Sequence, residues 1–155
     1  MLVSAYGEHD AMEILRYRPK DRSVTVRVNY LRCDDARLRS LFADDELEFD
    51  PGILPGMYKV HGAGDMTRMR AFQNGLFTIQ GESSVLAARM VGAKPGQTVL
   101  DACAAPGGKT AVLSEMMGDT GRVYAWDTHA HRVELIRGTM NRLKLENVRP
   151  AVKDA

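Results

Sequence analysis

The sequence predicts an α/β protein in which a small α+β unit, residues 1–75, precedes the first half of a parallel, doubly wound sheet, residues 76–155. From residue 98 onward, short apolar runs alternate with helical segments, as in parallel strands joined by crossover helices. Before residue 76 the elements are shorter, and Gly62, Gly64 and Gly75 indicate a hinge-like passage. With 155 residues, of which 45% are hydrophobic, the chain is long enough to bury a core.

The first unit is predicted to contain, in order, a helix, a strand, a second helix and a second strand, over residues 8–18, 23–29, 36–42 and 57–60. Pro19 is expected to end the first helix, and Asp34 is suited to cap the second. The first strand alternates valines with polar residues, which predicts a half-buried strand whose Arg27 points outward. The loop before the last strand contains two Pro-Gly pairs.

The second unit is predicted to begin with an extended segment and a helix, after which three strands alternate with two helices, over residues 77–80, 85–91, 98–100, 107–118, 122–126, 131–145 and 148–152. Ser83 or Ser84 is expected to cap the first of these helices. The strand over 98–100 is short and apolar, which is typical of a buried parallel strand. The last helix is amphipathic, with an apolar face made of Val133, Ile136, Met140 and Leu143.

The charge of the chain is balanced in total but uneven along the sequence. The 21 basic and 20 acidic residues give a net charge of +1, which argues neither for nor against a nucleic-acid partner. Residues 16–32 hold a local net charge of +5, and residues 34–50 hold a local net charge of −5. Two solvated segments that compensate each other, or a basic strand that contacts phosphate, are both compatible with this pattern.

The composition also indicates the cellular compartment and argues against a membrane partner and a metal site. Cys33 and Cys103 do not make a disulfide framework, which favours a cytoplasmic protein. No apolar run reaches the roughly 18 residues of a membrane helix, so no membrane partner is expected. His129 and His131 lack carboxylate or cysteine partners at metal-ligand spacing, so no metal site is predicted.

The residues most suited to chemistry follow the predicted parallel strands. The turn over residues 101–110 is built from small residues, and its helix N-terminus suits an anionic group. Asp127 ends the next strand, where a carboxylate commonly takes ribose hydroxyls. The turn misses a Walker loop by one residue and lacks a nicotinamide-binding Gly-x-Gly-x-x-Gly. S-adenosylmethionine (SAM), an adenosyl ligand with an amino-acid tail, fits the turn best, and a turn without any ligand remains the alternative.

Residues 99–110, Val-Leu-Asp-Ala-Cys-Ala-Ala-Pro-Gly-Gly-Lys-Thr, resemble the first methyltransferase motif of the Sun (RsmB-like) family of RNA (cytosine-5)-methyltransferases. Arg27-Val28-Asn29 resembles a strand of that family's small RNA-recognition-like amino-terminal subdomain. Residues 77–84 resemble the family's lead-in to the catalytic domain, although an acid is usual where Gly81 stands. Ala125-Trp126-Asp127, with Arg132, resembles the second motif. The similarity therefore spans nearly the whole chain.

This resemblance implies a Rossmann-like, SAM-dependent methyltransferase whose substrate is RNA, in particular ribosomal RNA. It implies that the cofactor is bound by Cys103, Ala104, Ala105, Pro106, Gly107, Gly108, Lys109, Asp127, Arg132 and Asp154. Asp127 would hold the ribose hydroxyls, and Asp154 would lie beside the adenine. Arg27 and Asn29 would contact RNA.

The catalytic cysteines of the resembled family are not matched. That family adds a cysteine thiolate to carbon 6 of cytosine, from a Thr-Cys-Ser segment, and uses a second cysteine in a Pro-Cys segment. Neither segment occurs in residues 1–155, so we expect a fragment with the cofactor half-site and no catalytic residue. An RNA-binding module without catalysis, or another SAM-dependent methyltransferase, remains open. An open edge on the strand over 98–100 would favour self-association.

Overall fold

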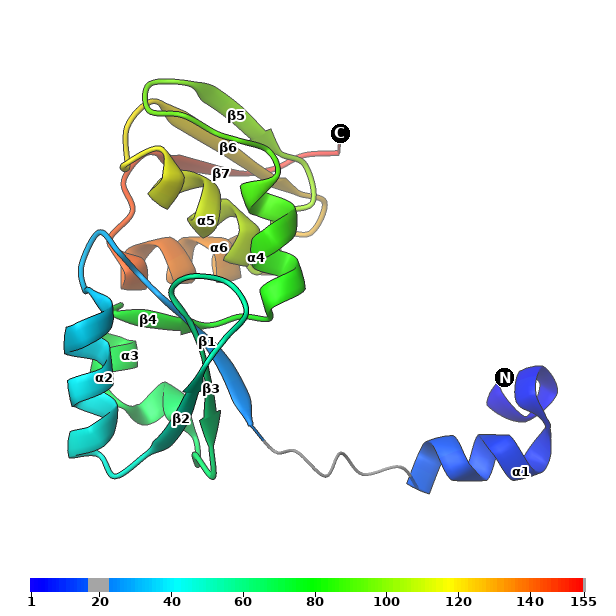
Figure 1. The fold of residues 1–155 in the computed structure, drawn as a ribbon. Coiled ribbons are helices and arrows are strands. Elements are labelled where there is room, and N and C mark those ends of the chain that lie inside the picture. Colours follow the sequence, from blue (N-terminus) through cyan, green and yellow to red (C-terminus); the bar gives the residue numbers. More distant parts are fainter. Residues whose placement is uncertain (17–22, 155) are drawn as a thin grey trace.

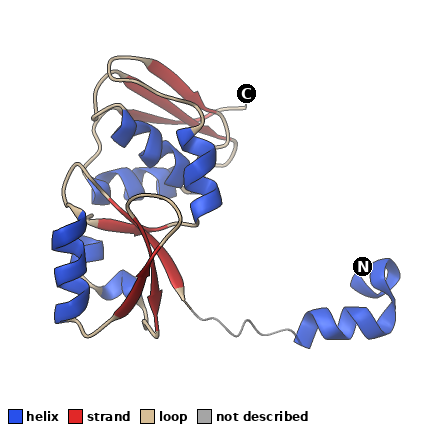
Figure 2. Cartoon of the chain, viewed as in Figure 1, coloured by secondary structure: helices blue, strands red, loops and turns tan. Residues whose placement is uncertain are grey.

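The computed structural model describes residues 1–16 and 23–154, and these form two sheets with helices between them (Figure 1). The first sheet is antiparallel with strand order β2-β3-β1-β4. The second is parallel with strand order β5-β6-β7, so the predicted α/β class with a parallel sheet is confirmed. Figure 2 shows that α4, α5 and α6 lie on the side of the parallel sheet that faces the first sheet.

The elements follow one another as α1 (Leu2–Arg16), β1 (Val24–Val28), α2 (Asp35–Asp44), β2 (Glu48–Pro51), β3 (Met57–His61), η1 (Met66–Arg68), α3 (Arg70–Gln73), β4 (Phe77–Ile79), α4 (Glu82–Arg89), β5 (Thr98–Asp101), α5 (Gly108–Met116), β6 (Arg122–Asp127), α6 (Ala130–Leu143) and β7 (Val148–Val152). The predicted helix end at Pro19 and the basic residues Arg18, Lys20 and Arg22 lie outside the described residues.

The first sheet has the strand order of an RNA-recognition-like fold, with α2 packed on one face. Phe42 of α2 is fully buried among Val26, Val60 and Phe77. Asp34 caps α2 as predicted, because its carboxylate accepts from the backbone N–H of Arg37 at 2.8 Å. The sequence pattern did not predict β2, because this strand is acidic and contains a proline. An edge strand tolerates a proline.

The extended segment over 77–80 is predicted to open the second unit, but its strand, β4, belongs to the first sheet. β4 pairs antiparallel with β1, with Val26 opposite Ile79 and Val28 opposite Phe77. The predicted boundary between residues 75 and 76 is therefore misplaced, because it cuts β4, an edge strand of the first sheet, off from that sheet. The expected serine cap of the next helix is also wrong, because α4 begins at Glu82 with Gly81 in the capping position.

The predicted apolar face of the last helix, α6, is confirmed, because it is buried against the parallel sheet. Val133, Ile136, Met140 and Leu143 of α6 are buried against Val123 and Ala125 of β6. The expectation of a buried strand over 98–100 is wrong, since Leu100 is 48% exposed. The described residues pair β5 only with β6, so β5 is an open edge. Val99 packs against the core of the helix-covered face, so the next residue, Leu100, points to the opposite face.

The two sheets are joined by a tight interface rather than by a hinge at Gly75. A Cβ atom built on Gly75 would lie 2.1 Å from the backbone oxygen of Arg142. The Arg142 guanidinium donates to the backbone oxygens of Phe72 and Phe77, at 2.9 and 3.0 Å, and lies 3.8 Å from the centroid of the Phe72 ring. Burial lowers the pKa of Arg142. The first sheet and α6 are therefore held together by polar contacts of the half-buried Arg142.

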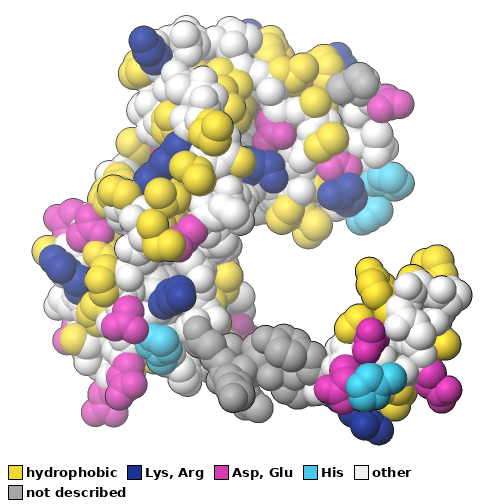
Figure 3. Space-filling model, turned by 45° about the vertical axis from the view of Figure 1, so that its right-hand side comes forward, with side chains coloured by type: hydrophobic (Ala, Val, Ile, Leu, Met, Phe, Trp, Pro, Cys, Tyr) yellow, Lys and Arg dark blue, Asp and Glu magenta, His cyan; other side chains and the backbone are white. Residues whose placement is uncertain are grey.

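The helix α1 is set apart from both sheets in Figure 1. It begins at Leu2, earlier than predicted, and the backbone of Gly7 interrupts it with a φ of 78°. Its visible surface in Figure 3 carries hydrophobic side chains, and the exposed ones include Leu2, Val3, Tyr6, Ile14 and Leu15. Within the part of the chain that the structure describes, no helix combines the length and apolar character needed to cross a bilayer.

Candidate functional site

The candidate site is the turn between β5 and α5, called here the cofactor loop (residues 101–109), together with the ends of β6 and β7. Within the loop, Gly107 directly precedes α5, and its φ of 104° is a left-handed conformation that favours glycine. A Cβ atom at Gly107 would also lie 3.1 Å from the Met140 Cε. No side chain caps α5, so its first-turn N–H groups suit an anionic group of a ligand.

The cofactor loop is tied to the neighbouring elements by hydrogen bonds. The backbone N–H of Ala104 donates to the oxygen of Trp126 in β6 at 2.9 Å. The hydroxyl of Thr139 in α6 donates to the oxygen of Pro106 at 2.8 Å. Asp101 accepts from the Thr110 hydroxyl at 2.7 Å, which closes the loop between the strand end and the helix. The small side chains thus lie on a backbone that is fixed from both sides.

Asp127 brings the second strand end into contact with this loop. The residue is 3% exposed, and its carboxylate accepts from the backbone N–H of Ala105 at 3.3 Å and from that of His129 at 3.4 Å. The Arg132 guanidinium lies 3.4 Å from Asp127 Oδ1, the oxygen that accepts from His129. The structure therefore places three of the predicted site residues, Ala105, Asp127 and Arg132, in one constellation.

Of the remaining predicted residues, Cys103, Pro106, Lys109 and Asp154 have exposed side chains, whereas Ala104 is buried. Cys103, Pro106 and Lys109 are exposed residues of the loop or of the first turn of α5. Val152 of β7 is the residue opposite Asp127, so Asp154 follows two positions beyond it at the same edge of the sheet. An exposed lysine and an exposed aspartate are thus available at the edge where Asp127 is buried.

Sequence reasoning missed a cation at this edge. The backbone N–H of Lys153 donates to the oxygen of Asp127 at 3.1 Å, and its Nζ lies 4.6 Å from the centroid of the Trp126 ring. Nothing in the local sequence pattern distinguishes Lys153 from a solvated lysine. Its position depends on the pairing of β6 with β7.

The prediction that Arg27 points outward is wrong. Arg27 is 3% exposed, and its guanidinium forms a two-pronged ion pair with the Glu115 carboxylate of α5. Burial raises the pKa of Glu115, and the Arg27 charge opposes that shift. RNA-recognition domains read bases on the open face of such a sheet, but here α4 and α5 cover that face. Arg27 is therefore not presented to RNA phosphates.

Asn29 is also buried and used within the chain. It is fully buried, and its Nδ2 donates to the backbone oxygens of Gly75 and Leu143 at 2.9 and 3.1 Å. The contact to Leu143 crosses from the first sheet to α6. Both residues predicted to bind RNA therefore join the two halves of the molecule.

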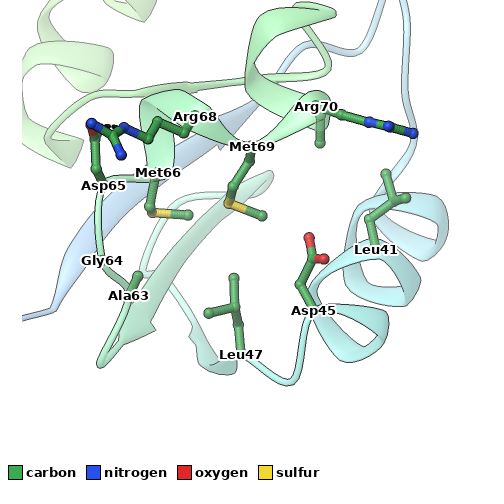
Figure 4. A pocket seen from close by; sticks show the side chains of 11 residues that line it. Leu41, Asp45, Leu47, Ala63, Gly64, Asp65, Met66, Arg68, Met69 and Arg70 are labelled. Carbon is green, nitrogen blue, oxygen red and sulfur yellow. Dashed lines mark ion pairs between the residues drawn. The ribbon is translucent and has the colours of Figure 1, made fainter.

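A separate concavity of about 600 Å³ lies in the first sheet's half, away from the cofactor loop (Figure 4). Met66, Met69 and Leu47 point into it. At its rim the Arg68 guanidinium lies 3.4 Å from the Asp65 carboxylate. This pocket shares no residue with the loop or the ends of β6 and β7, so we do not assign it to the same site.

Comparison with known proteins identifies the family. The sequence family "16S rRNA methyltransferase RsmB/F" matches residues 88–155. The protein "Probable ribosomal RNA small subunit methyltransferase B" of Bacillus subtilis is 39% identical over 153 residues, which are 99% of this chain and 34% of that protein. The chain belongs to the RsmB/F family of the Sun type. It spans about a third of the length of such relatives, since a second one, from Synechocystis, is also covered to 34%.

Solved structures agree with the observed fold. A methyltransferase homologue from Pyrococcus horikoshii superposes with a TM-score of 0.79 at 26% identity, over 99% of this chain and 50% of that one. NSun6 from the same organism, solved with SFG, superposes with a TM-score of 0.83 over 99% of this chain and 64% of that one. At 17% identity the latter supports the fold alone. The fold is therefore a half of a Rossmann-like methyltransferase sheet behind an α+β subdomain.

Proposed function

We propose that this chain forms the SAM half-site of an RNA cytosine-C5 methyltransferase that acts on ribosomal RNA in the cytoplasm. The observation that carries the proposal is the buried Asp127 carboxylate held against the backbone of Ala105 in the cofactor loop. Supporting it, one relative is named as a small-subunit rRNA methyltransferase and another as a tRNA (cytosine(72)-C(5))-methyltransferase.

The residues at the edge of the parallel sheet fit the chemical groups of SAM. The uncapped first turn of α5 and the exposed Lys109 suit the carboxylate of its amino-acid end. Asp127 suits the two ribose hydroxyls, because its oxygens make only long backbone hydrogen bonds at 3.3 and 3.4 Å. The Arg132 guanidinium lies 3.4 Å from that carboxylate, and Asp154 suits the amino group of adenine. SAM, when bound, supplies a methyl group on a sulfonium centre.

Neither cysteine of this chain is placed to activate cytosine. Carbon 5 of cytosine becomes nucleophilic when a thiolate adds to carbon 6, and a thiolate forms readily only at an accessible, low-pKa cysteine. Cys33 is buried in the core of the first sheet, and burial raises the pKa of its thiol. Cys103 lies in the loop that we assign to SAM. We therefore expect residues 1–155 to bind SAM without transferring its methyl group.

The test of this function is binding of SAM to the 155-residue chain, measured by isothermal titration calorimetry. Asp127→Ala removes the acceptor for two hydroxyls and is expected to weaken binding about a hundredfold, because charge-assisted hydrogen bonds are the strong ones. Asp44→Ala, which removes an exposed carboxylate at the end of α2, is the matched control and is expected to bind as the unaltered chain does. Binding that survives Asp127→Ala unchanged would refute the assignment.

A further inference from the structure

A buried polar cluster connects β1 of the first sheet to both ends of α5. Arg27 of β1 pairs with Glu115 near the carboxyl end of α5, and its Nη2 donates to Glu115 Oε1 at 2.9 Å. Its Nε donates to the side-chain oxygen of Gln80 at 2.9 Å. The side chains of Arg27 and Glu115 are 4% and 8% exposed, so this cluster is shielded from water.

Gln80 in turn contacts the first residue of α5. Because Arg27 fixes its oxygen, the Gln80 amide nitrogen points the other way, where it donates to the Ser84 hydroxyl at 3.3 Å. A Cβ atom built on Gly108 would lie 3.2 Å from that nitrogen and 3.5 Å from the amide carbon. The Gln80 amide therefore occupies the space beside Gly108 into which any larger side chain would extend.

Gly108 and Glu115 are seven residues apart, which is two helical turns, so they lie on the same face of α5. One cluster thus contacts α5 at its start and near its end. The start needs such support, because no side chain caps the helix and Gly107 adopts a left-handed conformation. The proposed SAM site uses this same first turn.

We propose that Gln80, held by Arg27 and Glu115, is a positioning residue that fixes the first turn of α5 and so preforms the cofactor loop for the amino-acid end of SAM. For its ligand this inference rests on the proposed function. For its geometry it rests only on the contacts of Gln80. It gives the first sheet a role at the cofactor site, although β1 presents no arginine to RNA.

The first test needs no ligand and measures amide hydrogen exchange in the 155-residue chain. The N–H groups of Gly107 and Ala111 donate to the oxygens of Ala104 and Gly107, so they report on the loop and the first turn. In Gln80→Ala we expect their exchange to be about tenfold faster, the effect of losing one local contact. The N–H of Met117, which donates to Leu113 at the other end of the helix, is expected to be unchanged.

Gln73→Ala is the matched control, because Gln73 is an exposed glutamine at the end of α3 in the same half of the molecule. It is expected to leave exchange at all three amides as it is in the unaltered chain. Equal exchange at Gly107 and Ala111 in Gln80→Ala and in the unaltered chain would overturn the proposal. A uniform increase that includes Met117 would also overturn it, since that is the signature of general destabilisation.

The second test measures SAM affinity for a pair of variants. Gly108→Ala places a methyl group against the Gln80 amide and is expected to weaken binding about tenfold, as is Gln80→Ala alone. In the double variant the shortened side chain leaves room for the methyl group, so the two losses are expected not to multiply. Losses that multiply would overturn the proposal. If the unaltered chain bound no SAM, the proposed function would fail, and the exchange experiment would still decide the role of Gln80.

Discussion

At the scale of single residues, two glycines are required by the close approach of another part of the chain. Gly75 has a φ of 71°, and a Cβ atom added to it would lie 2.1 Å from the backbone oxygen of Arg142. Gly121 has a φ of 68°, and a Cβ atom added to it would lie 2.2 Å from the backbone oxygen of Gln97. In both cases the contact atom is backbone, which moves only if a whole segment shifts. The first glycine lies at the interface of the two halves.

Gly75→Ala is therefore expected to lower the free energy of unfolding by about 3 kcal/mol or more, through left-handed strain and overpacking together. Gly62→Ala is the control for strain alone, because Gly62 has a φ of 60° and nothing within 4 Å of a Cβ position. It is expected to lose only about 1 kcal/mol. Urea unfolding followed by circular dichroism measures both values, and equal losses would contradict the interface contact.

Residues with long-range partners were the ones that the sequence pattern misplaced. Arg27 stands in an alternating strand, where a charged residue normally points to solvent. Its burial depends on Glu115, which is 88 residues away in the sequence. Asp127 and the small residues of the loop could be predicted, since they follow apolar strands directly. An acid inside the apolar helix α5 was the one local signal of the cluster at Arg27.

At the scale of elements, one carboxylate ties α2 to the first sheet. Asp35, in the first turn of α2, accepts from the hydroxyl of Tyr30 at 2.7 Å and from that of Tyr58 at 2.5 Å. Burial and the Asp35 hydrogen bond raise the pKa of each tyrosine to about 12. Burial of Asp35 acts to raise its pKa, but the two phenol hydrogen bonds, together with the Arg39 charge and a backbone hydrogen bond, outweigh it and leave that pKa lowered.

These directions predict the pH dependence of stability. The tyrosine pKa values are raised from 10.0 on folding, so their contribution is full below that pH and is lost as the pH rises towards about 12. The pKa of Asp35 is lowered on folding, so its contribution is lost as the pH falls below the ordinary range of an aspartate. Tyr58→Phe is expected to cost about 1 kcal/mol at neutral pH and to make the alkaline loss shallower.

Urea unfolding at a series of alkaline pH values measures this effect. Tyr124→Phe, which removes a phenol of β6 outside the cluster, is the control and should retain the alkaline loss of the unaltered chain. An identical alkaline profile for Tyr58→Phe and the unaltered chain would show that Asp35 does not hold the Tyr58 phenol.

Elements with strong periodicity were predictable, and elements defined by pairing were not. The apolar face of α6 and the strands β6 and β7 follow from local patterns alone. The sequence of β4 is equally compatible with the end of the first unit and with the start of the second. Only the pairing of β4 with β1 shows to which sheet it belongs. β2 is acidic and ends in Pro51, so its strand depends on β3.

At the scale of the whole molecule, the parallel sheet offers a surface for association. β5 forms one edge, and the register places Leu100 beside Tyr124 on the face opposite the helices. An unpaired edge next to exposed apolar side chains is a template for pairing with another chain. We therefore expect sedimentation velocity to show a species heavier than the monomer whose fraction grows with concentration.

Leu100→Lys places a charge on that face and is expected to reduce the heavier species. Leu135→Lys is the matched control, because Leu135 is 54% exposed on α6, on the other side of the sheet. A single monomeric species at every concentration of the unaltered chain would remove the basis for this expectation. An equal effect of both substitutions would assign the association to a different surface.

The cluster of Arg27, Gln80 and Glu115 also determines which segments can be exchanged with those of a relative in a chimera. A chimera that exchanges residues 1–80 for those of a relative would separate Arg27 and Gln80 from Glu115 and Gly108. A buried arginine without its carboxylate costs about 3–5 kcal/mol, so a transplanted subdomain must bring a matching α5 with it. The unit that can be exchanged is therefore the first sheet together with α5, rather than the first sheet alone.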